Sequence, residues 1–277
     1  MIPFIKAHAC GNDFLIVDQD AVRRSGWSAL ARRLCARNSG IGADGIEYFA
    51  WKNNSGPDTK SGRIRLHNAD GSVAEISGNG TRCVAAWMAR ASHAKAGDEL
   101  NIETDAGLRV CVLNSVTEDG GYSVEVTTGM GVPTFSPRTV TMPAGVQVRG
   151  AEISTGNPHF VILVDNPEFT VDGQAWQSVG QQICFLPDFP SQTNVEFARV
   201  VNGSEIEIRI FERGVGPTTS SGTGTSACAT AAIAQGVAKS PLRVVATGGT
   251  QTVAWSGPGT ELFLTGPASL IAQGEAW

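Results

Sequence analysis

The chain has 277 residues, of which 42% are hydrophobic and 33 are glycine, and its formal net charge is −5. A chain of this length can bury a substantial core, either as one large domain or as two of ordinary size. No basic block accompanies the acidic balance, which argues against a nucleic-acid partner. The first residues lack a signal-peptide layout, and no apolar run reaches membrane-spanning length. We therefore expect a cytoplasmic protein with neither a membrane nor a nucleic-acid partner.

The first half of the chain is typical of short strands and helices joined by glycine-rich turns. Residues 14–18 form a continuous apolar run, as in a strand buried on both faces. Ser28 is a candidate cap for a helix over residues 29–35. Residues 52–62 are polar and contain Gly and Pro, which favours an exposed loop. The further strands expected here cover residues 4–8, 46–49, 63–67, 102–104, 108–113 and 122–126.

The second half repeats this order of elements. Residues 129–143 are rich in Gly and Pro and are our candidate domain junction, and a helix is expected within residues 169–183. Residues 194–200 and 205–210 alternate apolar and polar side chains, as strands do. The Gly-Pro pair at 266–267 predicts a break before a short apolar segment. The remaining strands expected in this half cover residues 151–154, 160–165, 242–246, 251–255 and 261–264.

Cysteine usage argues against a metal centre and against a disulfide framework. The six cysteines are scattered, without a C-x-x-C pair or a cluster of cysteine and histidine. Unpaired cysteine commonly behaves as a small buried apolar residue. We therefore expect core positions and no bound metal for Cys10, Cys35, Cys83, Cys111, Cys184 and Cys228.

Two short stretches stand out because they are copies of one sequence motif. Residues 77–81 read Ser-Gly-Asn-Gly-Thr, residues 221–225 read Ser-Gly-Thr-Gly-Thr, and each opens a helix of small residues. We call them the two Ser-Gly loops. Glycines allow a tight turn that exposes backbone N–H groups, and the following helix adds unpaired donors and the positive end of its dipole. Each loop therefore predicts a nest for an anion with a hydroxyl beside it.

The two Ser-Gly loops belong to a repeat that extends over the whole chain. Gly222 follows Gly78 by 144 residues, and Glu212 follows Asn68 by the same 144 residues. The Gly-Asn pair at 156–157 follows the Gly-Asn pair at 11–12 by 145 residues. Three landmarks in one order predict two homologous α+β halves related by a pseudo-two-fold axis. Their matching loops would face each other across a cleft, where ligand sites commonly form.

Two anion nests that converge on one carboxylate would stabilise negative charge developing on it. Removal of a proton from the adjacent carbon needs this stabilisation, because its transition state resembles an enolate. Two acid/base groups on opposite faces of that carbon could take the proton from one side and return it on the other. The two-fold arrangement provides such a pair, and Ser77 and Ser221 occupy the expected positions.

Eight motifs distributed over the chain carry a resemblance to a known family. They are Gly11-Asn12-Asp13-Phe14, Gly40-Ile41-Gly42-Ala43-Asp44-Gly45, Asn68-Ala69-Asp70-Gly71-Ser72, Gly78-Asn79-Gly80-Thr81-Arg82-Cys83, Gly156-Asn157-Pro158-His159, Thr193-Asn194-Val195, Glu212-Arg213-Gly214 and Leu264-Thr265-Gly266-Pro267-Ala268. In this order they resemble the diaminopimelate epimerase family, the PLP-independent isomerases of lysine and cell-wall biosynthesis.

The resemblance implies a fold of two similar α+β halves, each a curved, mostly antiparallel sheet wrapped around a central helix. Residues 1–131 and 265–277 would form the N-terminal half and residues 132–264 the C-terminal half, with the active-site cleft between them. It also implies a small amino-acid substrate and no cofactor, and it leaves a homodimer open.

Candidate site residues follow from the same resemblance. By position, the residues that hold the non-reacting end of diaminopimelate are Asn12, Asn68, Asn157, Asn194 and Arg213, with Glu212 as a further contact and His159 lining the site. Backbone groups of Gly78, Asn79, Gly222 and Thr223 would clasp the reacting carboxylate. Arg213 suits its assignment because a guanidinium binds a carboxylate through two parallel hydrogen bonds.

The chain departs from the family at the two catalytic positions. The family uses a thiol/thiolate pair, whereas this chain has Ser77 and Ser221, either as natural residues or as deliberate replacements. A serine hydroxyl is far less acidic than a thiol, whose pKa is about 8.5, so it needs a neighbouring base. The candidates for that base are Glu75, Asp70, His67, His159 and Glu212.

Three interpretations of function remain. In the first, the chain epimerises an amino acid such as LL-diaminopimelate, with its serines activated by a neighbour or with another group moving the proton. In the second, it is a divergent isomerase with a different substrate. In the third, it binds an amino acid without turnover because serines replace the cysteine pair. We favour the first.

Overall fold

The computed structural model describes residues 1–52, 56–143 and 145–277. The chain divides into two compact units: unit 1 comprises Met1–Gly129 and Thr265–Trp277, and unit 2 comprises Met130–Leu264. Residues 53–55 of the loop expected over 52–62 lie outside the described part. The described remainder of that loop holds a short 3-10 helix, Pro57–Thr59.

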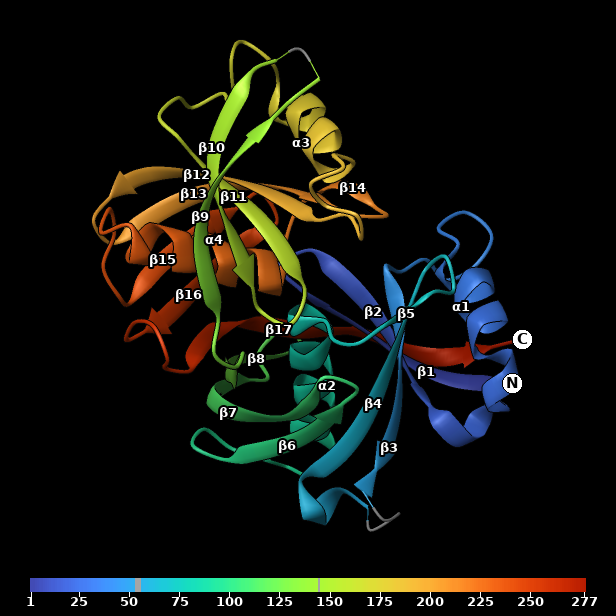
Figure 1. Cartoon of the computed structure of the whole chain (residues 1–277). Helices are drawn as coiled ribbons and strands as arrows, with labels where there is room; N and C mark the ends of the chain where they lie inside the picture. Colours follow the sequence, from blue (N-terminus) through green and yellow to red (C-terminus); the bar gives the residue numbers. More distant parts are fainter. Residues whose placement is uncertain (53–55, 144) are drawn as a thin grey trace. The chain divides into compact units, whose positions relative to one another are not determined.

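Unit 1 is a closed ring of strands around one helix, α2 (Gly78–Ala91) (Figure 1). In order around the ring, the strands are β17 (Leu262–Ala276), β1 (Ile2–Ala9), β2 (Asn12–Asp18), β3 (Gly45–Trp51), β4 (Ser61–Asn68), β6 (Glu99–Thr104), β7 (Gly107–Thr117) and β8 (Tyr122–Gly129). The β2–β3 and β4–β6 pairs are parallel. The ring closes because β17 pairs with β1 on one side and with β8 on the other.

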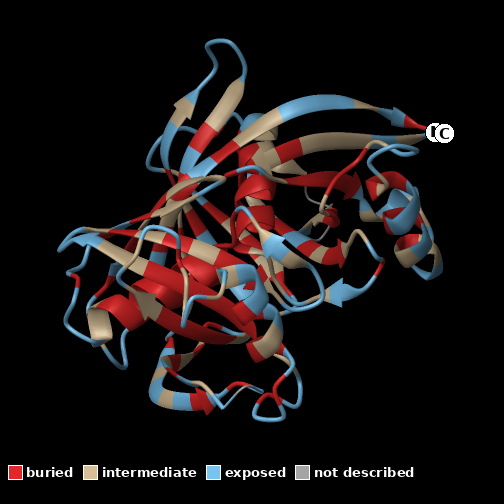
Figure 2. Ribbon diagram, turned by 90° about the horizontal axis from the view of Figure 1, so that it is seen from above, coloured by how far each residue is buried: buried red, intermediate tan, exposed pale blue. Residues whose placement is uncertain are grey.

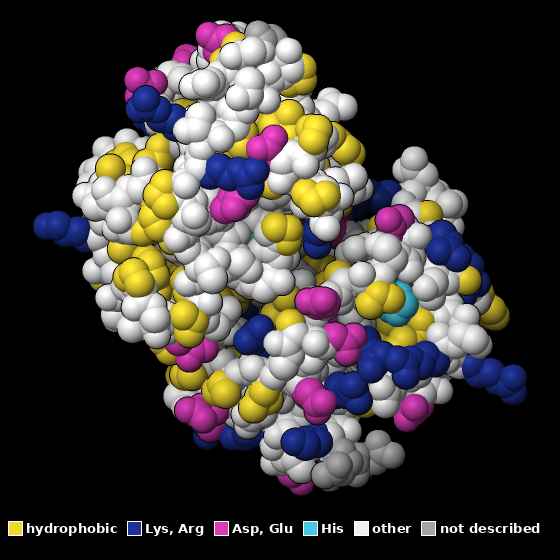
Figure 3. Space-filling view, viewed as in Figure 1, with side chains coloured by type: hydrophobic (Ala, Val, Ile, Leu, Met, Phe, Trp, Pro, Cys, Tyr) yellow, Lys and Arg dark blue, Asp and Glu magenta, His cyan; other side chains and the backbone are white. Residues whose placement is uncertain are grey.

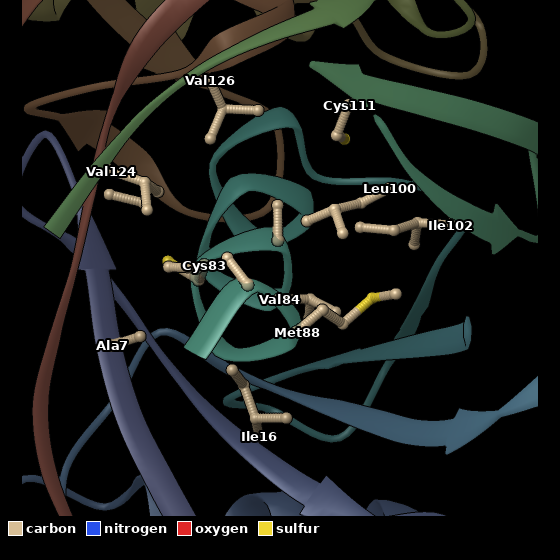
Figure 4. Packing of buried hydrophobic residues seen from close by; sticks show 14 of the residues in the cluster. Ala7, Ile16, Cys83, Val84, Met88, Leu100, Ile102, Cys111, Val124 and Val126 are labelled. Atoms are coloured by element: carbon tan, nitrogen blue, oxygen red, sulfur yellow. The ribbon is translucent and has the colours of Figure 1, made fainter. Parts of the chain in front are cut away.

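The core of unit 1 is built on α2, which contacts β1, β2, β3, β6 and β8. Val84 and Met88 of this helix are completely buried, as are Leu100 and Ile102 on β6 (Figure 4). Small residues dominate the rest of the helix, so the surrounding strands can approach it closely. Outside the ring, helix α1 (Trp27–Cys35) packs on β3 and β4, while the two-residue strand β5 (Val73–Ala74) pairs with β4.

Unit 2 repeats this arrangement around the helix α4. Its elements are β9 (Thr134–Thr141), β10 (Gln147–Ser154), β11 (Pro158–Val164), α3 (Trp176–Cys184), β12 (Asn194–Asn202), β13 (Glu205–Glu212), β14 (Gly216–Thr218), α4 (Gly222–Ala234), β15 (Leu242–Ala246) and β16 (Gly249–Trp255). The β11–β12 and β13–β15 pairs are parallel, and the β9–β10, β10–β11, β12–β13 and β15–β16 pairs are antiparallel. Parallel and antiparallel pairs thus follow one another as in unit 1.

The α+β fold class is therefore confirmed, with two similar halves that each wrap a mostly antiparallel sheet around a helix. Both central helices are buried along nearly their whole length (Figure 2). Each unit also places a second helix outside its sheet, α1 in unit 1 and α3 in unit 2. This outer helix explains why β2 in unit 1 is buried on both faces, as its apolar run predicted.

Two local expectations were wrong, namely the cap of α1 and the break at residues 266–267. Helix α1 begins at Trp27 with Gly26 as its cap, so Ser28 lies inside its first turn. The two units divide after Gly129, within the expected junction, and the later part of that stretch forms strand β9, which pairs along its whole length with β10. Strand β17 runs through residues 266–267 without a break; the proline is accommodated because pairing with β1 begins only at Ser269. The strand expected over residues 194–200 is confirmed as β12, and α3 and α4 both pack on it and bury Val195, Glu196 and Phe197 in succession.

The surface carries charges of both signs. On the face shown in Figure 3, acidic side chains are scattered, and several basic side chains lie together at the lower right. Ion pairs on the described surface include Arg138 with Asp188 and Arg199 with Glu207, each at 2.7 Å. In the described part of the chain, no helix is long and apolar enough to cross a membrane.

Candidate active site

Each central helix begins at the serine of a Ser-Gly loop, and that serine caps it. The backbone of Ser77 is extended, and its Oγ accepts a hydrogen bond from the N–H of Gly80 at 3.1 Å. Ser221 is also extended, and its Oγ accepts from the N–H of Gly224 at 3.2 Å. Serine is preferred at this position because its oxygen satisfies a backbone donor that the helix leaves unpaired. The two hydroxyls therefore have a structural role, whatever else they do.

The first turn of each central helix is braced in the same way. The guanidinium Nη1 of Arg82 donates to the carbonyl of Gly78 at 3.1 Å. In α4, the hydroxyl of Ser226 donates to the carbonyl of Gly222 at 2.9 Å. Arg82 is completely buried, and burial lowers the pKa of its guanidinium. These bonds fix the peptide groups that would clasp a carboxylate, since the first N–H groups of a helix are directed away from its body.

In unit 1, the side chains of Asn12 and Asn79 meet. Asn79 Nδ2 donates to Asn12 Oδ1 at 3.1 Å, and Asn12 Nδ2 donates to Asp44 Oδ2 at 2.6 Å. The carboxylate of Asp44 thus orients the Asn12 amide toward the first turn of α2. Asn68 lies at the end of β4, in a separate turn where its Nδ2 donates to Ser72 Oγ at 3.0 Å.

In unit 2, a continuous series of polar side chains leads from Ser221 to a buried carboxylate. Ser221 Oγ lies 3.4 Å from Thr223 Oγ1, which accepts from Asn157 Nδ2 at 3.4 Å. Asn157 Oδ1 lies 2.9 Å from His159 Nε2, and His159 Nδ1 lies 2.7 Å from Glu196 Oε1. The structure therefore brings together four of the site residues expected from the sequence and adds Glu196, which was not expected.

His159 and Glu196 form a buried hydrogen-bonded pair. The amide oxygen of Asn157 can only accept, so His159 Nε2 carries a hydrogen. The contact between His159 Nδ1 and Glu196 Oε1 then requires a hydrogen on one of these two atoms. Both side chains are completely shielded from solvent. The pair is therefore a proton-holding group beneath the second Ser-Gly loop.

The remaining residues expected at the far end of the substrate meet at the ends of β12 and β13. Asn194 Oδ1 accepts from the backbone N–H of Arg213 at 3.0 Å, which ties the two strand ends together. Arg213 Nη1 donates to the carbonyl of Ser191 at 3.2 Å. Glu212 Oε1 accepts from the hydroxyl of Thr218 at 2.9 Å.

Two of the candidate bases are engaged elsewhere in unit 1. The ring of His67 packs edge-on against Trp27 and Tyr48, with centroids 5.9 and 5.4 Å away. Asp70 accepts hydrogen bonds from the hydroxyl and backbone N–H of Ser72, which lower the pKa of its carboxyl. These contacts support structural roles for both residues. Glu75 is exposed and lies between β5 and α2.

Two completely buried carboxylic acids, Glu47 and Glu196, were missed by sequence reasoning. Each is the third residue of the strand that pairs in parallel with the apolar strand of its unit, β3 in unit 1 and β12 in unit 2. Each lies against the second glycine of the nearby Ser-Gly loop. Aligning the two halves strand by strand would have found them, since they occupy corresponding positions.

The cysteines are core residues, as expected. All six are free and buried. Burial raises the pKa of Cys35 to about 12 and that of Cys111 to about 11, and it raises the pKa of Cys83 and Cys228 further from neutrality. Neither Cys83 nor Cys228 therefore offers a thiolate for proton transfer. Among the described residues, no group of three or more His, Cys, Asp and Glu side chains is placed to hold a metal ion.

Comparison with solved structures shows that the fold is a known one. A Bacillus anthracis phenazine biosynthesis protein of the PhzF family superposes with a TM-score of 0.72 at 17% identity, covering 100% of this chain and 99% of that one. A hydroxyproline epimerase from Agrobacterium vitis, with bound trans-4-hydroxy-L-proline, gives a TM-score of 0.70 at 16% identity, covering 99% and 90%. The fold is thus shared with epimerases.

Sequence comparison identifies the family. The profile of the diaminopimelate epimerase family matches residues 4–135 and 152–271. Diaminopimelate epimerase from Pseudomonas savastanoi pv. phaseolicola is 34% identical over 287 aligned positions, which cover 99% of each chain. The chain belongs to the diaminopimelate epimerase family. The resemblance found in the motifs and the isomerase class expected from it are both confirmed.

Proposed function

We propose that the chain epimerises an amino acid by moving the proton on the carbon next to a carboxylate, with diaminopimelate as the nearest named substrate. The observation that carries this proposal is the duplication of one device. Both units start their central helix with a serine-capped glycine turn whose first carbonyl is braced by a side chain four residues later. A protein that needed only two stable helices would not need the same anion nest in both.

The carboxylate is the group that the two loops would bind. Backbone N–H groups at Gly78 and Asn79, and at Gly222 and Thr223, would bind one carboxylate oxygen each. Negative charge grows on these oxygens as the α-proton leaves, so donors fixed beforehand lower the barrier. This action requires both loops to reach one substrate, and residues 1–131 with 265–277 and residues 132–264 would therefore bound one cleft.

The far end of the substrate would be held by the amides and by Arg213. The amides are those of Asn12, Asn68, Asn157 and Asn194, with Glu212 as a further polar contact and His159 lining the site behind Asn157. A second amino-acid end, with both an ammonium and a carboxylate, suits this mixture of acceptors, donors and one guanidinium. We place the reaction in the cytoplasm without a cofactor, and a homodimer stays open.

Exchange of the α-proton tests the proposal directly. In heavy water the wild-type chain should exchange the α-hydrogens of diaminopimelate, and Ser77→Ala and Ser221→Ala should each reduce that exchange about 100-fold or more. Ser204→Ala, in the exposed turn between β12 and β13, serves as the matched control. Exchange that continues undiminished in both alanine variants would remove the serines from the mechanism.

A second function, amino-acid binding without turnover, is favoured by the capping role of both hydroxyls. If the serines serve only as caps, the chain should bind diaminopimelate by calorimetry yet exchange no proton. The double variant Ser77→Cys with Ser221→Cys distinguishes the cases, because exchange that appears only in this variant would show that the serines silence an otherwise intact site. Binding and exchange both absent for diaminopimelate would favour a different isomerase substrate.

A further inference from the structure

Glu47 is a buried acid that the stability of the fold does not explain. It lies in the middle of β3, between Ile46 and Tyr48, and its side chain is completely buried. Neither carboxyl oxygen has a hydrogen-bond partner among the described residues. Burial raises the pKa of this carboxyl to about 8. An apolar side chain in the same place would avoid the cost of burying an unpaired polar group.

The carboxyl of Glu47 lies directly beneath the first Ser-Gly loop. A Cβ atom built on Gly80 would stand 2.0 Å from Glu47 Oε1 and 3.2 Å from the Cβ of Ser77. The acid and the serine side chain therefore converge on one glycine, and a larger residue at this position would displace the acid. Gly80 also donates its N–H to Ser77 Oγ at 3.1 Å. That bond uses a lone pair of the hydroxyl and leaves its hydrogen free to be directed elsewhere.

Unit 2 contains the same arrangement. A Cβ atom on Gly224 would stand 2.9 Å from Glu196 Oε1, 3.2 Å from Ser221 Cβ and 3.4 Å from Ser221 Oγ. Glu196 differs in having His159 as a partner at 2.7 Å, while its second oxygen has none among the described residues. One buried acid beneath one glycine could be an accident of packing. Two at corresponding positions, each beside a capping serine, indicate a shared purpose.

We propose that Glu47 is a positioning residue that exchanges the substrate proton through the hydroxyl of Ser77, and that Glu196 with His159 does the same through Ser221. The inference rests on the function proposed above and supplies the base that serine chemistry lacks. It also replaces the earlier candidates Glu75, Asp70 and His67, which are exposed or engaged elsewhere.

The relay conserves atoms and electrons. As the α C–H bond breaks, its electron pair stays with the substrate as an enediolate, and the proton passes to the oxygen of Ser77. The hydroxyl proton of Ser77 passes at the same time to Glu47, which takes part in its ionised form and becomes a neutral carboxylic acid, so the serine stays neutral. The second relay then delivers a proton to the carbon from the pair of Glu196 and His159 by way of Ser221. The reverse reaction uses the same groups in the opposite order.

Glu47 and Ser77 make no hydrogen bond with each other in the described structure, so the relay needs a rotation of the acid about its side-chain bonds. The titratable neighbour on α2 is Cys83, whose own pKa is raised by burial and further by Glu47. Because that thiol stays protonated, it does not compete with Ser77 for the proton.

Glu47→Gln keeps the shape of the side chain and removes its ability to take a proton. We expect this variant to fold and to bind diaminopimelate as the wild type does, while proton exchange falls about 100-fold or more and the ionisation of Glu47 disappears from the pH profile of kcat/KM. Glu47→Leu should lose proton exchange to the same extent as Glu47→Gln. If the site needed only a polar side chain, Glu47→Gln would keep its activity and Glu47→Leu would lose it. Glu125→Gln, exposed on β8, is the matched control. Exchange in Glu47→Gln within about threefold of the wild type overturns the proposal.

A second measurement does not depend on turnover. The protonated carboxyl of Glu47 should give an infrared C=O band that titrates in the wild type, is missing from Glu47→Gln and shifts in Ser77→Ala. If the wild-type chain exchanges no proton on diaminopimelate, the function proposed above fails for that substrate, and the infrared titration alone decides on the relay. A band that Ser77→Ala leaves unmoved would then overturn it.

Discussion

Replacing Glu47 by glutamine should make the protein more stable, and increasingly so as the pH rises. In the unfolded chain this carboxyl has its ordinary pKa of about 4.5, whereas burial raises the folded pKa to about 8. Below pH 4.5 it is protonated in both states and contributes no pH dependence. Between the two values only the unfolded chain loses the proton, so each pH unit lowers the free energy of unfolding by about 1.4 kcal/mol.

This slope gives a definite size to the effect. By pH 7 the wild type should have lost about 3 kcal/mol and by pH 8 about 4 kcal/mol, and the loss levels off at about 5 kcal/mol above that pH. Glutamine cannot ionise, so Glu47→Gln should keep the stability that the wild type has at low pH. The gain is large compared with a typical net stability of about 5–15 kcal/mol.

Urea unfolding followed by tryptophan fluorescence at intervals from pH 4.5 to 8.5 measures the difference between the two chains. The exposed Glu125→Gln variant should show no such trend. A difference between wild type and Glu47→Gln that stays constant across this range would refute the reasoning, because Glu47 would then ionise in the folded protein as it does in water.

Three further predictions concern the surroundings of the site. Gly80→Ala should lower the free energy of unfolding by about 1–3 kcal/mol and displace Glu47, because the new Cβ would lie 2.0 Å from the acid. The control Gly203→Ala, with open space around it, should change the free energy of unfolding by less than about 0.5 kcal/mol. Thermal unfolding compares the two variants. The six buried cysteines should resist iodoacetamide in the folded chain, and rapid labelling of any thiol with loss of activity would contradict a serine mechanism. Burial alone would raise the pKa of Asp13, but hydrogen bonds from Arg37 and Lys6 lower it. Asp13→Asn should therefore lower the free energy of unfolding by about 2 kcal/mol at pH 7 and by progressively less below about pH 4. Acid titrations of stability measure this difference.

Much of the fold could be predicted because the repeat leaves clear marks in the sequence. The glycine turns at 78 and 222 open the two central helices, and the apolar run at 14–18 is a strand buried on both faces. Tertiary packing overrides the local signal in two places. The Gly- and Pro-rich stretch that contains β9 forms a strand because β10 is available along its whole length. Likewise, β17 continues past Pro267 because that residue precedes its pairing with β1.

The two Ser-Gly loops of the candidate site could be predicted from the sequence, and the buried acids beneath them could not. Ser77 and Ser221 could be found from spacing alone, and their contacts with Gly80 and Gly224 follow from ordinary helix capping. The burial of Glu196 could not be predicted, because strict alternation assigns a polar residue to an exposed face of a strand. In the structure α3 and α4 cover both faces of β12. Which acid lies under which hydroxyl depends on contacts between distant segments, and local patterns carry no information about these.

Strand β17 has a consequence for folding of the chain during its synthesis on the ribosome. Its first residues, Leu262–Leu264, belong to unit 2, and the following residues close the ring of unit 1 between β8 and β1. Unit 1 is therefore synthesised almost entirely before unit 2 but stays open until residues 265–276 have emerged. Unit 2 needs nothing beyond residue 264 and can close earlier. The order of folding is thus expected to reverse the order of synthesis. The first Ser-Gly loop and the buried Glu47 beneath it are then among the last parts of the chain to be enclosed.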